Sequence, residues 1–111
     1  MAMVPIFNNQ TGPLPVKTTF KSPTDAGATI TISGSLRSTG APTLIGFKVL
    51  IDGKQQSVSH IWSNADDVHR ATVPINIPAP KDFNPHTLTL EPLNSNSIGD
   101  QNDYFTAILD Y

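Results

Sequence analysis

Side chains with oxygen donors are concentrated in one segment near the C-terminus, at residues 94–103, which reads NSNSIGDQND. It contains five Asn and Asp residues, whose side chains offer oxygen donors: Asn94, Asn96, Asp100, Asn102 and Asp103. Calcium binds six to eight such oxygens, often from the carboxylates and Asn carbonyls of one loop. The segment has no Lys or Arg, so we expect Asp100 and Asp103 to repel each other unless a cation screens them. We therefore expect millimolar calcium to raise the melting temperature.

A second interpretation of the same segment needs no metal. Residues 100–103, DQND, begin like a calcium loop but lack the Gly and the bidentate Glu that an EF-hand carries downstream. Asn and Asp side chains also hydrogen-bond to their own backbone in turns that connect strands. The candidate metal ligands are Asn94, Asp100, Asn102 and Asp103, and turn formation is the alternative.

The three histidines are the other candidates for chemistry. His60 and His69 lie nine residues apart and could be neighbours on paired strands, with Asp66, Asp67 or Asp82 as a third partner. No known spacing of metal ligands, nucleophile motif or phosphate-binding loop occurs, and a small domain rarely forms a deep cleft. We therefore expect local hydrogen bonds for the histidines and expect that the protein is not an enzyme.

Trp62 is the only tryptophan. An exposed indole can stack on the apolar face of a sugar ring, whereas most tryptophans lie in or beside a core. The pattern of the segment around Trp62 favours burial. Sugar contact is the alternative, and the candidate sugar-binding residues are Trp62, Asp100, Asn102 and Asp103.

These residues are positioned by extended segments, of which 43–62 is the clearest. Asp52-Gly53 between alternating apolar residues predicts a hairpin with a type I′ turn. Uninterrupted pairing would place Ile51 opposite Lys54, Val49 opposite Gln56, Phe47 opposite Val58 and Ile45 opposite His60. One face would then carry the apolar residues together with His60 and Trp62.

Period-two alternation continues in several other segments, which are 16–21, 28–35, 68–77, 87–90 and 104–111. No segment has helical periodicity, so we predict an all-β chain. It is expected to form a single antiparallel β-sandwich domain, residues 1–111, of seven to eight short strands, with either jelly-roll or immunoglobulin-like topology. Residues 1–15 contain three prolines and are expected to form an arm or an edge strand.

Composition limits the partners. The 111 residues carry a net charge of −2, whereas nucleic acids and anionic membranes attract basic surfaces. There is no Cys and no apolar run of membrane-spanning length. The first residues lack the pattern of a signal peptide, so we expect a soluble protein that is cytoplasmic or exported by a non-classical route.

Several short segments resemble the small calcium-dependent galactose-binding lectins of bacteria. They are Met1-Ala2, Asn8-Asn9, GATITI at 27–32, Ser38-Thr39-Gly40, LTL at 88–90, the Asn- and Asp-rich loop and the strand around Phe105. The resemblance implies an oligomeric β-sandwich whose last loop binds calcium, with calcium binding sugar hydroxyls. It assigns the metal role to Asp100, Asn102 and Asp103, with Asn94. The H-P-x-Q sugar loop of that family is missing, and Asn102-Asp103 replaces an Asn pair, so galactose specificity is not implied.

The sequence thus leads to two expectations of function. The first is a non-enzymatic carbohydrate-binding protein, a small soluble lectin that forms a homo-oligomer, with calcium as a possible cofactor. The alternative is a structural or adhesive β-sandwich subunit of a larger assembly, in which the N-terminal segment contacts a neighbour.

Overall fold

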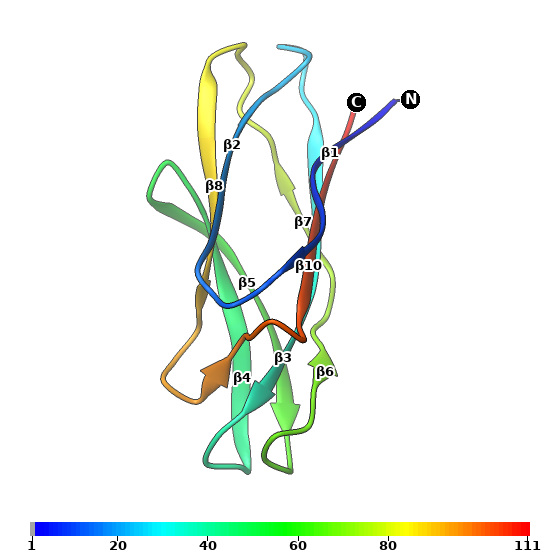
Figure 1. Cartoon of the computed structure of the whole chain (residues 1–111). Helices are drawn as coiled ribbons and strands as arrows, with labels where there is room; N and C mark the ends of the chain where they lie inside the picture. Colours follow the sequence, from blue (N-terminus) through cyan, green and yellow to red (C-terminus); the bar gives the residue numbers. More distant parts are fainter. Residues whose placement is uncertain (1) are drawn as a thin grey trace.

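A computed structural model describes residues 2–111 (Figure 1), and this part of the chain contains ten strands and no helix. The strands are β1 (Met3–Thr11), β2 (Val16–Lys21), β3 (Thr29–Ser38), β4 (Thr43–Ile51), β5 (Lys54–Ser63), β6 (Arg70–Ala71), β7 (Ile75–Pro78), β8 (Pro85–Pro92), β9 (Ser97–Ile98) and β10 (Tyr104–Asp110). The predicted all-β class is confirmed. No helix among the described residues is long and apolar enough to span a membrane.

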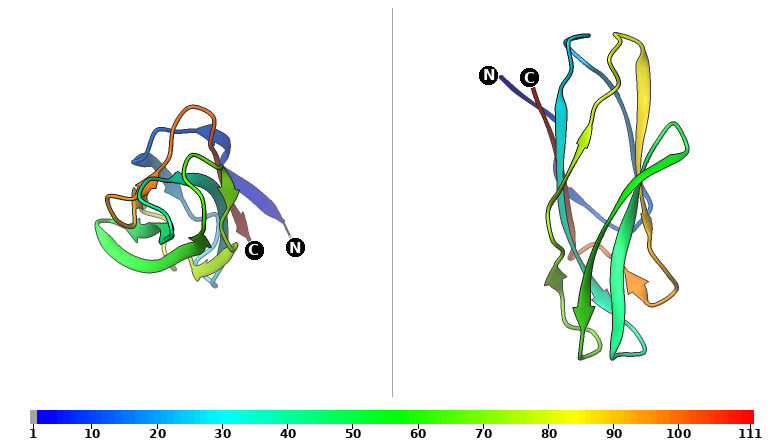
Figure 2. Two further views of the ribbon diagram at one scale, coloured as in Figure 1. Left: turned by 90° about the horizontal axis from the view of Figure 1, so that it is seen from below. Right: turned by 180° about the vertical axis from the view of Figure 1, so that it is seen from behind.

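The strands form two antiparallel sheets that pack face to face (Figure 2). The first sheet has the order β1-β10-β3-β6, and both β7 and β9 also pair with β3. The second sheet has the order β2-β8-β4-β5. Since β6 and β7 pair with successive parts of β3, they are one interrupted strand, and Pro74 between them lacks the N–H that a continuous ladder needs. The observed architecture is the predicted antiparallel sandwich.

The strand order decides between the two topologies that the sequence left open. In an immunoglobulin-like sandwich several consecutive strands are neighbours in a sheet. Among the described residues, β4 and β5 are the only consecutive strands that pair. The others pair as nested partners, β3 with β6 and β7, β2 with β8, and β1 with β10, and successive pairs alternate between the sheets. This is a jelly roll, a long hairpin rolled up around its β4–β5 centre.

The β4–β5 turn is of the predicted type, but the predicted register is wrong beyond it. Asp52 and Gly53 have φ angles of 52° and 81°, as a type I′ turn requires. Ile51 pairs with Lys54, but a register shift places Val49 opposite Ser57 and Leu44 opposite Trp62. One extra residue in β5 forms a bulge, which turns the rest of the strand over.

Because of this bulge, β5 directs Ser59, Ile61 and Ser63 towards the other sheet. The two serines are buried and have partners there: Ser59 Oγ donates to Thr72 Oγ1 at 2.7 Å, and Ser63 Oγ lies 2.8 Å from Ser38 Oγ. These hydrogen bonds make the polar inner face of β5 compatible with burial. His60 and Trp62 consequently lie on the outer face.

The core between the sheets consists of the apolar residues that alternate along the strands. Phe47 and Phe105 are fully buried and meet edge to face, with ring centroids 5.7 Å apart. Phe105, Ala107 and Leu109 of β10 are buried, as are Ile30 and Ile32 of β3. This core joins the inner faces of the two sheets and leaves their outer faces to carry the exposed side chains.

The N-terminal segment is an edge strand of the first sheet. β1 pairs with β10, and Ala2 and Tyr111 exchange backbone hydrogen bonds of 2.7 and 2.9 Å. The two ends of the chain therefore lie side by side (Figures 1 and 2). Of the two sequence interpretations, the structure supports the edge strand and not a projecting arm.

Candidate functional site

Asp103 lies immediately before β10 and is fully buried. Its Oδ1 accepts a hydrogen bond from Ser35 Oγ at 2.9 Å and lies 2.7 Å from Nδ1 of His69. Its Oδ2 accepts the backbone N–H of Asp100 at 2.9 Å. A buried carboxylate needs such donors, because its own hydration has been removed. Asp103 is therefore the centre of a polar cluster on the outer side of the first sheet.

The loop before Asp103 is a tight turn closed by its own aspartates. The backbone N–H of Asp103 donates to the carbonyl of Asp100 at 3.0 Å, and Asp100 Oδ1 accepts the N–H of Asn102 at 2.9 Å. Asn94 behaves in the same way earlier in the segment, where its Oδ1 accepts the N–H of Asn96 at 3.1 Å and Ser97 Oγ at 2.8 Å. The turn chemistry that was the second interpretation of this segment is present.

Arg37 neutralises the loop from outside it. This residue of β3 donates from Nε to Asp100 Oδ2 at 3.0 Å and from a terminal nitrogen to Asp67 Oδ1 at 2.6 Å. The backbone N–H of Asn102 and then the Arg37 side chain hold the pKa of Asp100 below its ordinary value. Asp100 in turn raises the pKa of Arg37. The expectation of two uncompensated carboxylates is therefore wrong, because the compensating cation comes from a different strand.

His69, Asp100 and Asp103 together form a possible metal-ligand group, whose ligand atoms all lie within 4.8 Å of one another. Each carboxylate oxygen of the two aspartates already accepts a hydrogen bond, from Ser35, Arg37 or the backbone. A bound cation would have to share these oxygens with their present donors and would lie close to the positive charge of Arg37. The cluster is consequently complete as a hydrogen-bonded network.

The candidate metal and sugar residues do not form one site. Asp100 and Asp103 are together, whereas the Asn94 side chain donates to the carbonyl of Leu44 and is held in its own turn. Asn102 is exposed and lines a small hollow of about 290 Å³ with Pro13, Asp100 and Gln101. Asp103 is buried and cannot touch a sugar.

Trp62 lies on the outer face of the second sheet, whereas the Asp103 cluster lies on the outer side of the first. Its expected burial is wrong, because the bulge in β5 turns it outwards and leaves it 54% exposed. Its Nε1 donates to Asn64 Oδ1 at 2.9 Å, and Leu44, also exposed, is its cross-strand neighbour. We call the exposed side chains of Leu44, His60, Trp62 and Asn64 the Trp62 surface.

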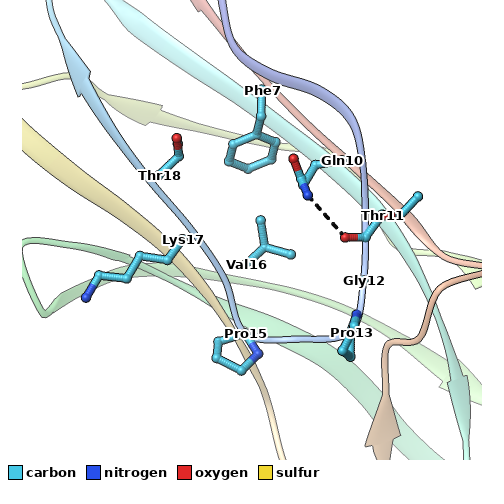
Figure 3. Close-up of a pocket in the computed structure, with 9 residues that line it drawn as sticks. All are labelled: Phe7, Gln10, Thr11, Gly12, Pro13, Pro15, Val16, Lys17 and Thr18. Carbon is cyan, nitrogen blue, oxygen red and sulfur yellow. Dashed lines mark hydrogen bonds between the residues drawn. The ribbon is translucent and has the colours of Figure 1, made fainter.

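A second hollow lies at the open edge of the sandwich, where β1 and β2 separate (Figure 3). Phe7 and Val16 form its apolar part, and Gln10, Thr11 and Thr18 add polar groups, with Gln10 donating to the carbonyl of Thr11 at 3.4 Å. Its volume is about 550 Å³. It lies between two edge strands, and its lining includes the charged residue Lys17.

Sequence reasoning missed Arg37, which is central to the cluster, and the pairing of His69 with Asp103. The signal for Arg37 was available, since it continues the polar outer face of β3 beyond Ser33 and Ser35. The aspartates considered as third partners of His60 and His69 make other contacts: Asp66 accepts the N–H of Ala41, Asp67 binds Arg37, and Asp82 contacts His86.

Comparison with known proteins adds no assignment: no protein-family model matches this chain, and no curated protein matches it significantly.

Proposed function

We propose that the protein is a non-enzymatic carbohydrate-binding protein and that the Trp62 surface contacts the sugar. The observation that carries the proposal is the exposure of Trp62 together with the hydrogen bond from its Nε1 to Asn64. The ring is held in place before any ligand arrives, so little conformational entropy is lost on binding. A fixed indole face beside polar His60 and Asn64 suits a sugar ring, which has an apolar face and a rim of hydroxyls.

The test is a glycan array followed by titration of the best ligand. Trp62→Ala is expected to weaken binding about tenfold or more, since losing an aromatic contact of about 1.4 kcal/mol changes Kd tenfold. Phe83→Ala is the matched control, because Phe83 is a similarly exposed aromatic on the loop before β8. Silence of the wild-type protein on a broad array, or equal losses for the two variants, would contradict the proposal.

In a calcium-assisted form of this proposal, calcium would bind at the cluster of His69, Asp100 and Asp103. Calcium prefers oxygen ligands, and here it would compete with the Arg37 guanidinium for Asp100. Sugar binding at the Trp62 surface does not require it. If EDTA abolishes binding of the array ligand, the calcium-dependent form is correct and the hollow beside Asp100 and Asn102 becomes the sugar contact.

The alternative function, a subunit of a larger assembly, is favoured by the exposed edge of the first sheet. β1 is nine residues long, and its Met3 and Val4 are 66% and 38% exposed beside Tyr111, which is 43% exposed. Open strand edges with apolar side chains pair readily with another chain. We propose this edge as the contact in a homo-oligomer.

Multi-angle light scattering tests the assembly role. Met3→Lys should lower the measured mass of the wild-type oligomer towards the 11.9 kDa of one chain. Val73→Lys is the control, because Val73 is 60% exposed but lies between β6 and β7, away from β1. A wild-type protein that is monomeric at high concentration would contradict the assembly role without affecting the sugar-binding proposal.

A further inference from the structure

His86 is held between two carboxylates that come from two other segments of the chain. Its Nδ1 lies 2.5 Å from Asp52 Oδ2, and its Nε2 lies 2.7 Å from Asp82 Oδ1. The imidazole itself is 15% exposed, whereas the two aspartates are about half exposed, at 49% and 43%. Both ring nitrogens are thus committed to acceptors.

This geometry selects one protonation state. A neutral imidazole has one N–H and one lone pair, so it can donate to only one of the two carboxylates. The lone pair would then face the second, ionised carboxylate. Only the imidazolium, with two N–H groups, donates to both.

The two aspartates connect His86 to the backbone of three segments. Asp52 is in the β4–β5 turn; its Oδ1 accepts the N–H of Thr87 at 2.9 Å, and its own N–H donates to the Thr87 carbonyl at 2.9 Å. Asp82 Oδ1 accepts the N–H of Asn84 at 2.9 Å and so shapes the loop 79–84. His86 itself is the second residue of β8.

We propose that protonated His86 is a pH-dependent clamp, which fastens the β4–β5 turn and the loop 79–84 to the beginning of β8 and opens when the imidazole loses its proton. Opening removes the contact of His86 with one carboxylate and leaves that aspartate held only by its hydrogen bonds to the backbone. The adjoining hollow of about 410 Å³ on the second sheet is lined in part by Asp52, Gly53 and Thr87, so its wall changes with the clamp.

The charges around His86 favour its protonated form. Asp52 and then Asp82 raise the pKa of His86 above its ordinary value, and His86 lowers the pKa of each aspartate. Lys54, across the turn, also favours the ionised form of Asp52. From β2 the neighbour is the apolar ring of Phe20, with its centroid 6.2 Å from that of His86, and Lys21 lies opposite Pro85.

The directions of these pKa shifts define the pH range in which the clamp contributes to stability. Because the folded pKa of His86 is raised, its contribution is fully present below about 6.5, the unfolded value, and is lost as pH rises through the folded pKa. Because the folded pKa values of Asp52 and Asp82 are lowered, their contributions are present above about 3.9 and are lost as pH falls through the folded values. The clamp is therefore closed in mildly acidic solution and opens on the alkaline side.

An NMR titration of the wild-type protein tests the clamp. The His86 ring signals should titrate with a midpoint above about 6.5, and this midpoint should fall in Asp52→Asn and Asp82→Asn and fall furthest in the double variant. At both positions asparagine keeps an oxygen acceptor for the backbone N–H, and in place of Asp52 it is also favoured in the type I′ turn, so both variants should fold. A wild-type midpoint at or below about 6.5, or no change in the double variant, would overturn the proposal.

The backbone amides separate a clamp from a merely charged histidine. The N–H signals of Thr87 and Asn84 should move with the same midpoint as the His86 ring, because their acceptors are the carboxylates that His86 binds. The N–H of Asn96 is the control, since its acceptor, Asn94 Oδ1, has similar geometry and does not titrate. If Thr87 and Asn84 do not follow His86, the clamp does not exist.

Discussion

Two histidines of this jelly roll contact aspartates, and the two contacts are built in opposite ways. At His69 the carboxylate of Asp103 is fully buried and the imidazole is partly exposed, and one ring nitrogen is used. At His86 the imidazole is the more buried partner, both carboxylates are exposed, and both ring nitrogens are used. In the first contact the histidine is one of several donors to a buried carboxylate. In the second contact one histidine bridges two exposed carboxylates.

The difference determines which group is indispensable. Asp103 also accepts from Ser35 and from the backbone of Asp100, so His69 is one of three donors to it and contacts it through a single ring nitrogen. His86 has no neutral form that satisfies both Asp52 and Asp82. We therefore expect the His86 clamp to contribute stability only while the imidazole is charged.

Removing Asp103 should have the largest effect. Asp103→Ala leaves Ser35, His69 and the N–H of Asp100 without their buried acceptor, and we expect a loss of about 3 kcal/mol in the free energy of unfolding. Urea denaturation at neutral pH measures it. The control Asp110→Ala, a partly exposed carboxylate at the other end of β10, should change it by less than about 0.5 kcal/mol. Similar losses for both variants would show that Asp103 contributes no more to stability than a partly exposed carboxylate does.

Replacing each histidine by glutamine compares the two contacts directly. Gln carries its N–H donors on a single nitrogen, which is sufficient for Asp103 but does not reproduce the two separate ring nitrogens through which His86 contacts Asp52 and Asp82. The melting temperature of the wild-type protein should fall between about pH 5 and about pH 8. That fall should be reduced in His86→Gln and retained in His69→Gln. If His69→Gln also reduces it, the contrast between the two contacts is incorrect.

The smallest expected effect concerns calcium at the Asp103 cluster. In the wild-type protein Arg37 already supplies the positive charge beside Asp100, so we expect millimolar calcium and EDTA to leave the melting temperature nearly unchanged. Arg37→Ala frees Asp100 Oδ2, and calcium should then raise the melting temperature of the variant. Lys17→Ala, on the outer face of β2, is the control for general loss of positive charge. A clear calcium shift in the wild-type protein would restore the calcium site that the sequence suggested.

Much of the fold could be read from local patterns. Alternation in β2, β3 and β10 identified the buried residues, because a strand presents every second side chain to one face. Asp52-Gly53 identified the turn at the centre of the roll, since few other pairs tolerate two positive φ angles. The single extra residue in β5 had no such signal, and it reversed the expected faces of His60 and Trp62.

The sequence by itself determined the all-β class, the β4–β5 turn and the turn chemistry of Asn94 and Asp100, because each depends on residues only a few positions apart. The tertiary structure decided the jelly-roll topology and the partners of the charged side chains. Arg37 meets Asp100 across 63 positions, and both His69 with Asp103 and His86 with Asp52 are 34 positions apart. Such pairs are set by how the nested strands are rolled together. A local pattern carries no information about which distant outer-face residues this rolling brings into contact.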